Sequence, residues 1–182
     1  MAEKREWETA AHGDDGYVRK DAPLVLFRGA LDHAEAEVIL TQTLLQRQLT
    51  EERGKPREKA ETLVGYLQEL LDLLRAVMTA EYRGEPLEVA TLFGYTLDEL
   101  QERSHNAEQF YGVPTMTRPD YKYGETYARL NLLRTELRKV ETTAVRLLAN
   151  DAGEPARPDL LYTLNRLSSA AHVLMCWWIS EK

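Results

Sequence analysis

Glycine and proline, which interrupt helices, gather in five clusters along this chain. Between the clusters lie stretches of helix length in which apolar residues recur every three or four positions. The only β-like run is residues 25–27, and one short strand without a partner cannot form a sheet. We therefore predict an all-α fold, a five-helix bundle with short connections. The clusters are residues 13–23, 54–56, 84–86, 112–124 and 153–158.

The helical segments are recognised by their apolar spacing, and one of them also has a start signal. Thr96 and Glu99 form a capping box, in which the hydroxyl and the carboxylate satisfy amides that the first turn leaves unpaired. A shorter helix should therefore begin at Leu97. The helices are expected at residues 31–49, 59–82, 97 to about 110, 127–149 and 158–179.

Length and charge limit what such a bundle can do. The 182 residues, 43% of them apolar, suffice for one domain, with residues 1–23 as a flexible polar arm before residues 24–182. The net charge of −7 disfavours nucleic-acid binding, which needs a surplus of Lys and Arg. No stretch long enough to cross a membrane is free of charges. The single Cys176 leaves no internal disulfide, which fits a cytoplasmic location.

A polar stripe on the fourth segment is the clearest candidate site. Asn131, Arg134, Arg138 and Glu141 recur at intervals of three, four and three residues, which places them on one side of a helix. The opposite side is apolar and would face the core. The alternative interpretation is a solvated charged face with an Arg138–Glu141 pair, which would contribute at most a few tenths of a kcal/mol.

Two other regions could contact a nucleotide. Asn165, beside Arg166, lies on the same line as Ser168 and His172 in an otherwise apolar segment, so it is either a core amide or a nucleotide ligand.

In the arm, Gly13, Asp14 and Gly16 followed by Lys20 could form a loop whose amides hold phosphates. A plain surface arm would have the same composition.

Two further patterns favour structural roles. Glu102 and His105 have the Glu-x-x-His spacing of di-iron bundles, but those sites need two copies, so His105 is interpreted as a helix-end histidine. Cys176 lies in an apolar aromatic segment and is interpreted as a core or subunit-contact residue. We therefore predict no metal held by protein side chains.

Two segments resemble a known family. Residues 130–141 read LNLLRTELRKVE and residues 157–169 read RPDLLYTLNRLSS, which is similar to the corrinoid adenosyltransferases of the ethanolamine-utilisation (EutT) and propanediol-utilisation (PduO) types. The EutT likeness is the closer, and it extends back through Ser104-His105 and residues 97–100 to residues 27–32. It covers residues 24–178 and is densest in the last two helices.

The PduO type implies roles for the polar stripe. Its fourth helix carries an Arg-x-x-x-Arg-x-x-Glu series that binds ATP and shapes the subunit interface, and the matching residues are Arg134, Arg138 and Glu141. An Asp of the first long helix, which pairs with the first of these arginines across the trimer interface, matches Asp32.

The resemblance extends to other nucleotide contacts. The Asn of the family's Asn-Arg-Leu-Ser series matches Asn165, with Arg166 beside it. The family's phosphate loop resembles residues 9–17, with Tyr17 in place of its closing Thr, and a lysine that follows matches Lys20. An aromatic that crowds the lower face of cobalt matches Tyr111.

The resemblance also implies a reaction. Such enzymes transfer the 5′-deoxyadenosyl group of ATP to the cobalt of cob(I)alamin, with Mg²⁺, in homotrimers whose active sites lie between subunits. A reductase that supplies Co(I) and an adenosylcobalamin-dependent enzyme are the implied partners. The histidine and cysteine cluster that holds a metal in EutT enzymes has no counterpart, so no structural zinc or iron is predicted. The rivals are an inactive corrinoid carrier on the same scaffold and a di-iron oxidase.

Overall fold

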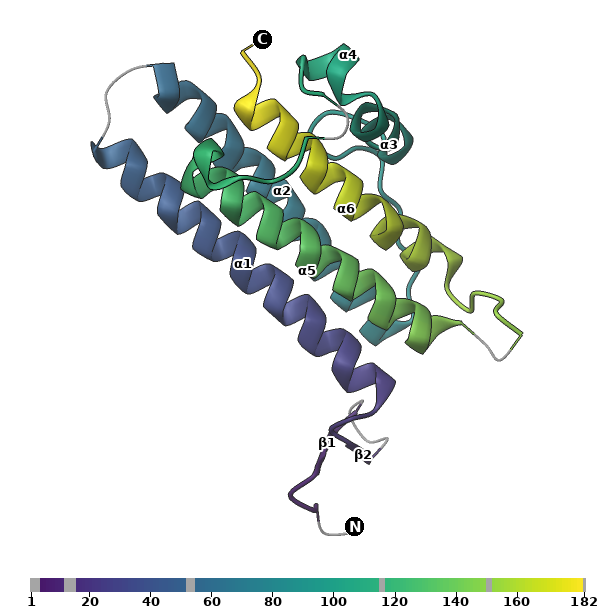
Figure 1. Ribbon diagram of the computed structural model, residues 1–182. Helices are drawn as coiled ribbons and strands as arrows, with labels where there is room; N and C mark the ends of the chain where they lie inside the picture. Colours follow the sequence, from purple (N-terminus) through teal and green to yellow (C-terminus); the bar gives the residue numbers. More distant parts are fainter. Residues whose placement is uncertain (1–3, 12–15, 52–54, 115–116, 150–151, 182) are drawn as a thin grey trace.

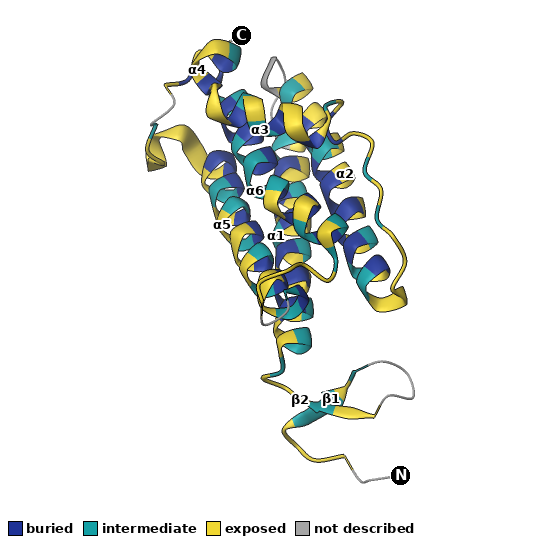
Figure 2. Ribbon diagram, turned by 90° about the vertical axis from the view of Figure 1, so that its right-hand side faces the viewer, coloured by how far each residue is buried: buried dark blue, intermediate teal, exposed yellow. Residues whose placement is uncertain are grey.

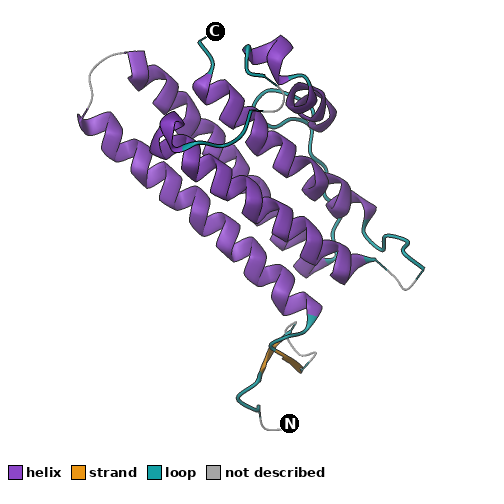
Figure 3. Ribbon diagram, in the orientation of Figure 1, coloured by secondary structure: helices purple, strands orange, loops and turns teal. Residues whose placement is uncertain are grey.

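The computed structural model describes residues 4–11, 16–51, 55–114, 117–149 and 152–181 (Figure 1). Helices dominate these residues (Figure 3), which confirms the all-α prediction. The four long helices are α1 (Pro23–Glu51), α2 (Lys55–Arg83), α5 (Gly124–Leu148) and α6 (Pro158–Ile179). Shorter elements are β1 (Glu8–Ala10), β2 (Tyr17–Arg19), α3 (Leu97–His105), α4 (Ala107–Tyr111) and the 3₁₀ helix η1 (Tyr121–Tyr123).

The long helices form the bundle, and α5 lies between α1 and α6 (Figure 1). Helix α2 packs on α1 and α6, while α3 and α4 pack on α6. Each long helix turns an apolar face inward, as the dark inner surfaces of Figure 2 show. Leucines fill this core, among them Leu67 of α2, Leu133 of α5 and Leu164 of α6, all fully buried. The predicted apolar faces are therefore the ones that pack.

Helix α1 begins eight residues earlier than predicted, at Pro23 rather than Leu31. Proline is favoured in the first helical turn, since its missing N–H would be unpaired there and its backbone angle suits a helix. The β-like run at residues 25–27 is therefore helical, and the Phe27 side chain within it is fully buried in the core.

The predicted helix 97–110 is interrupted at Asn106. Its capping box is confirmed, since Thr96 Oγ1 accepts from the Glu99 amide at 3.2 Å and Glu99 Oε2 accepts from the Thr96 amide at 2.7 Å. At Asn106 the backbone leaves helical geometry with φ −115° and ψ 40°, and its side chain donates to the Glu102 carbonyl at 2.9 Å. Six α-helices, rather than five, are thus seen in the described residues.

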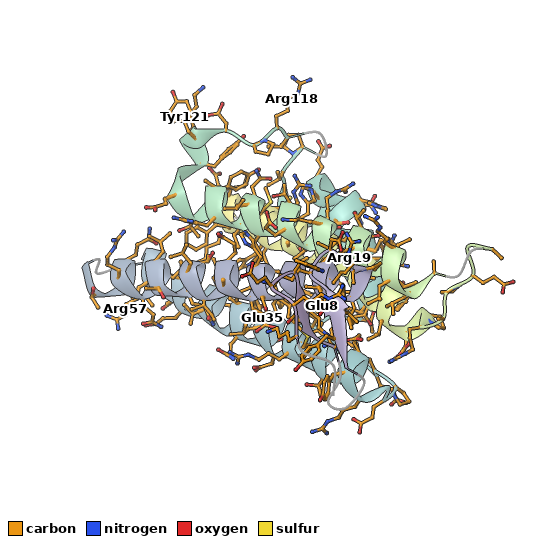
Figure 4. All side chains as sticks on the ribbon, turned by 90° about the horizontal axis from the view of Figure 1, so that it is seen from below. Glu8, Arg19, Glu35, Arg57, Arg118 and Tyr121 are labelled. Atoms are coloured by element: carbon orange, nitrogen blue, oxygen red, sulfur yellow. The ribbon has the colours of Figure 1, made fainter. Side chains whose placement is uncertain are left out.

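A hairpin that the sequence did not predict precedes α1. Strands β1 and β2 pair antiparallel with Glu8 opposite Arg19. These two residues are labelled in Figure 4. Three-residue strands are too short to show a clear alternation in the sequence. The hairpin lies beyond the start of α1 (Figures 1 and 2), and Arg28 of α1 donates to the Ala11 carbonyl at 2.7 Å. Within this arm, Gly13 and Asp14 lie outside the described residues.

A partly buried ion pair at the start of α6 is hydrogen-bonded to the end of α2 and the residues that follow it. Arg157 pairs with Asp159 at 2.7 Å and donates to the carbonyls of Ala80 and Glu85 at 3.2 and 2.7 Å. Asp159 also accepts from the Leu87 amide at 2.9 Å. The hydrogen bond from Arg157, and then those from the backbone, hold the pKa of Asp159 well below its usual range.

We expect Asp159→Asn to lower the free energy of unfolding by about 1–3 kcal/mol near neutral pH, since it removes one charged partner of this network. A depressed carboxylate pKa stabilises the folded state above the unfolded pKa of about 4 and loses that contribution as the pH falls below it. The difference in the free energy of unfolding between Asp159→Asn and wild type should therefore become smaller in acid. Urea unfolding at several pH values measures it, and a difference that stays constant down to low pH would contradict this origin.

Candidate functional site

A groove opens between α3, α5 and α6. Its volume is about 420 Å³, within the range of small-ligand sites. All its lining side chains in the described part of the chain are polar or basic, and none is a carboxylate. They are Ser104 and His105 from α3, Arg134 and Arg138 from α5, and Ser168, Ser169 and His172 from α6.

The two arginines of the predicted stripe face this groove without an acidic partner. Arg134 is held in place by Asn131 Oδ1, which accepts from its Nε and Nη2 at 3.3 and 3.1 Å. Burial lowers the pKa of the Arg134 guanidinium, and the like charge of Arg138 lowers it further. No salt bridge to Arg134 or Arg138 occurs among the residues that the structure describes. An anion in the groove would relieve this repulsion, so the site favours anionic ligands.

A second cluster joins α5, α6 and α3 beside the groove. Asn165 Nδ2 donates to Glu141 Oε1 at 2.6 Å, and Arg166 Nη1 donates to Asn165 Oδ1. Arg166 also pairs with Asp98 at 3.3 Å and stacks on Tyr162. This chain of contacts joins α3, α5 and α6 through polar side chains.

The structure bears on the structural alternatives for Asn165 and for the Arg138–Glu141 pair. Asn165 is exposed, so the core-amide interpretation is wrong, although the expected bond to a neighbouring helix is present. Glu141 bonds Asn165, and no Arg138–Glu141 ion pair occurs in the described part of the chain. The stripe therefore lacks, in the described residues, the internal ion pair that the solvated-face interpretation expected.

Other predicted site residues are not brought to the groove. Asp32 is exposed on α1, and it forms no ion pair with Arg134 within the described chain. Gly16, with φ 85°, and Lys20 lie in the hairpin region beyond α1. Tyr111 is only 8% exposed, and its ring packs against Phe110 rather than lining the groove.

The sequence interpretation missed the histidines and serines of the groove. His105 does end α3, as expected, but it also lines the groove, together with Ser104. On α6, Ser168 and His172 follow Asn165 by three and seven residues, a helical spacing that places them on one line. The sequence analysis noted this polar line through an apolar helix but gave Ser168 and His172 no role in the site.

The thiol of Cys176 lies next to the imidazole of His172. Its Nε2 lies 3.5 Å from Cys176 Sγ. Burial raises the pKa of the Cys176 thiol to about 11, so the thiol stays protonated near neutral pH and is a poor nucleophile. Burial also lowers the pKa of the His172 imidazole, and the positive charges of Arg134 and then His105 act in the same direction. These surroundings favour the neutral form of the His172 imidazole.

Comparison with known proteins gives the family. The family model described as "Cobalamin adenosyltransferase" matches residues 6–178, nearly the whole chain. The chain belongs to the cobalamin adenosyltransferase family. This confirms the resemblance seen in the sequence.

Two curated relatives are identical to this chain at about a third of the aligned residues. The "Corrinoid adenosyltransferase EutT" of Salmonella typhimurium is 34% identical over 161 residues, which is 88% of this chain and 55% of that protein. The protein of the same name from Escherichia coli K12 is 32% identical over 165 residues, or 91% of this chain and 56% of that protein. The chain thus spans just over half the length of these relatives. No solved structure matches significantly.

The described residues lack two kinds of feature. Among the described residues, no group of three or more His, Cys, Asp or Glu side chains could hold a metal ion. No helix in the same residues is long and apolar enough to span a membrane. The groove presents cationic and neutral hydrogen-bond donors.

Proposed function

We propose that this protein is an ATP:corrinoid adenosyltransferase, which transfers the 5′-deoxyadenosyl group of ATP to Co(I) of a corrinoid such as cob(I)alamin. Membership of the family and the names of both relatives support the activity. The observation that carries the proposal is the groove where Arg134 and Arg138 lie together without a carboxylate among its described lining residues. Such a site suits a strongly anionic leaving group.

The reaction requires the protein to stabilise the negative charge that develops on the leaving triphosphate. The electron pair of Co(I) attacks C5′ of ATP, the Co–C bond forms, and the C5′–O bond breaks to release triphosphate with its electron pair. Arg134 and Arg138 would bind the triphosphate oxygens through charge-assisted hydrogen bonds as this charge develops. No proton has to be removed from the substrate, so the transfer requires no general base.

Glu141, Asn165 and Arg166 would orient the nucleotide. Glu141 and Asn165 are bonded across α5 and α6 at 2.6 Å, so the amide has a fixed orientation before a ligand arrives. Preorganised polar groups lose little entropy on binding, which favours a defined position of C5′ relative to cobalt. Mg²⁺ would be held by the phosphates of ATP, with Glu141 as a partner through water.

A homotrimer would complete the site. Arg134 has no acidic partner in the described part of its own chain, and Asp32 is exposed, which is the arrangement expected if the two pair across subunits. The hairpin with Gly16 and Lys20, which projects from the bundle (Figure 2), would bring the phosphate loop with Gly13 and Asp14 to a neighbouring subunit. The burial of Tyr111 does not support a place for it beside cobalt.

The test is an anaerobic mixture of the purified protein with cob(I)alamin, ATP and Mg²⁺. Loss of the Co(I) absorbance and formation of a light-sensitive Co–C product, both absent without protein, are expected. No reaction, with the melting temperature still raised by ATP or corrinoid, would favour the inactive carrier instead. No reaction and no shift with either ligand would contradict both. A reductase and an adenosylcobalamin-dependent enzyme are the partners that this activity would need.

A further inference from the structure

The groove holds more hydrogen-bond donors than the two arginines. Five other side chains line it, two histidines and three serines, and each can donate a hydrogen bond. Together with the arginines they surround about 420 Å³ with donors and with no carboxylate from the described residues. A lining of this kind fits a ligand with many acceptor oxygens and several negative charges.

We infer that His105 and His172 bind the polyphosphate chain of the nucleotide beside Arg134 and Arg138, and that this binding is coupled to protonation of His172. The inference rests on the proposed function, because the groove is taken to receive the triphosphate part of ATP. Both histidines act as positioning residues for the leaving group. The phosphodiester of a corrinoid has a single negative charge and would satisfy fewer of these donors.

In the free protein the surroundings of His172 disfavour its charged form. Its imidazole is mostly buried and lies close to two like charges or potential charges, those of Arg134 and His105, which lower its pKa. Cys176, at 3.5 Å, remains a neutral thiol and cannot compensate an imidazolium. The titratable groups that face His172 are His105 of α3, Arg134 and Arg138 of α5, and Cys176 of α6. Tyr111 of α4 and Tyr127 of α5 lie near Cys176, behind the imidazole.

A bound polyphosphate reverses these conditions. Its negative charges offset those of Arg134 and Arg138, and an oxygen at hydrogen-bond distance stabilises the imidazolium of His172, so the pKa of His172 rises. Binding then takes up a proton from solution. The sign follows from linkage: a ligand that raises a histidine pKa binds more tightly as the pH falls through the bound pKa toward the free pKa.

The experiment is isothermal titration calorimetry of the full chain with inorganic triphosphate, in pairs of buffers that differ in ionisation enthalpy. It compares wild type with His172→Gln, which keeps a side-chain hydrogen bond but cannot titrate. Because triphosphate itself titrates, the result is the ratio of the two Kd values at each pH, in which the ligand's own protonation cancels. His33→Gln, an exposed histidine of α1 outside the groove lining, is the matched control.

The Kd of His172→Gln divided by the Kd of wild type is expected to rise as the pH is lowered from about 8.5 to 6.5. The rise should be up to about tenfold per pH unit. Proton uptake by wild type should exceed that of His172→Gln, and His33→Gln should match wild type. His105→Gln, at an exposed helix end where folding is not at risk, should weaken binding several-fold. A ratio that does not change with pH, or no binding of triphosphate at any pH, overturns the inference.

Failure of this inference is distinguishable from failure of the proposed function. If wild type forms the Co–C product but the Kd ratio is constant, the transferase stands and His172 is not coupled to the phosphate. If binding is proton-linked through His172 but no adenosyl transfer occurs with cob(I)alamin, the site stands and the transferase is contradicted.

Discussion

Arg138→Ala is expected to lower kcat/KM for adenosyl transfer by about 100- to 1,000-fold, the usual cost of removing one preorganised donor to a developing anion. Arg138 lines the groove beside Arg134, and no carboxylate partner is found for it in the described residues, so its charge is available to the leaving triphosphate. Removing it should not disturb packing, since the side chain is exposed. Circular dichroism should therefore show unchanged helix content while the Co(I) assay shows the loss.

Arg146→Ala is the matched control for this experiment. Arg146 is an exposed arginine of the same helix, two turns beyond Arg138 and outside the groove lining. It should keep near wild-type turnover, which separates loss of a specific contact from a general loss of positive charge on α5. Near-normal turnover by Arg138→Ala would remove Arg138 from the proposed mechanism.

Phe27→Ala is expected to lower the free energy of unfolding by about 3–5 kcal/mol, the range for truncating a buried aromatic side chain. Phe27 is fully buried in the first turns of α1, and alanine would leave a cavity that its neighbours fill only in part. For a chain of this size the melting temperature should fall by about 6–20 °C. Urea unfolding at one fixed protein concentration measures the loss.

The neighbouring Leu26→Ala provides the comparison. Leu26 is 39% exposed on the same helical turn, so its truncation should cost less than about 1 kcal/mol. Similar losses from both substitutions would contradict the inward orientation of Phe27, and with it the early start of α1 at Pro23.

Helical periodicity predicted most of the fold because it depends on local spacing. The apolar faces of residues 59–82, 127–149 and 158–179 pack as expected, and the capping box at Thr96 starts α3. Features without a local signal were missed. The break at Asn106 involves neither glycine nor proline, and the start of α1 was concealed by a β-like run that becomes helical through burial of Phe27.

The candidate site was likewise predicted only in part from the sequence. One-helix spacing predicted that Arg134, Arg138 and Glu141 lie on one stripe, because it follows from 3.6 residues per turn. The bond from Asn165 to Glu141 depends on how α5 and α6 are rotated against each other, which sequence spacing does not specify. His172 was placed on the line of Asn165 but given no role in the site, because its position beside Arg134 appears only when the helices pack.

The contacts from Glu141 through Asn165 and Arg166 to Asp98 have a thermodynamic consequence. Arg166 and Asp98 are 68 residues apart in the chain, so they pair only when α3 and α6 are packed together. A chain without this packing also lacks the groove, whose lining comes from α3, α5 and α6. Every ligand that binds here therefore selects the fully assembled bundle, and at saturating concentration it draws the folding equilibrium toward the native state by mass action.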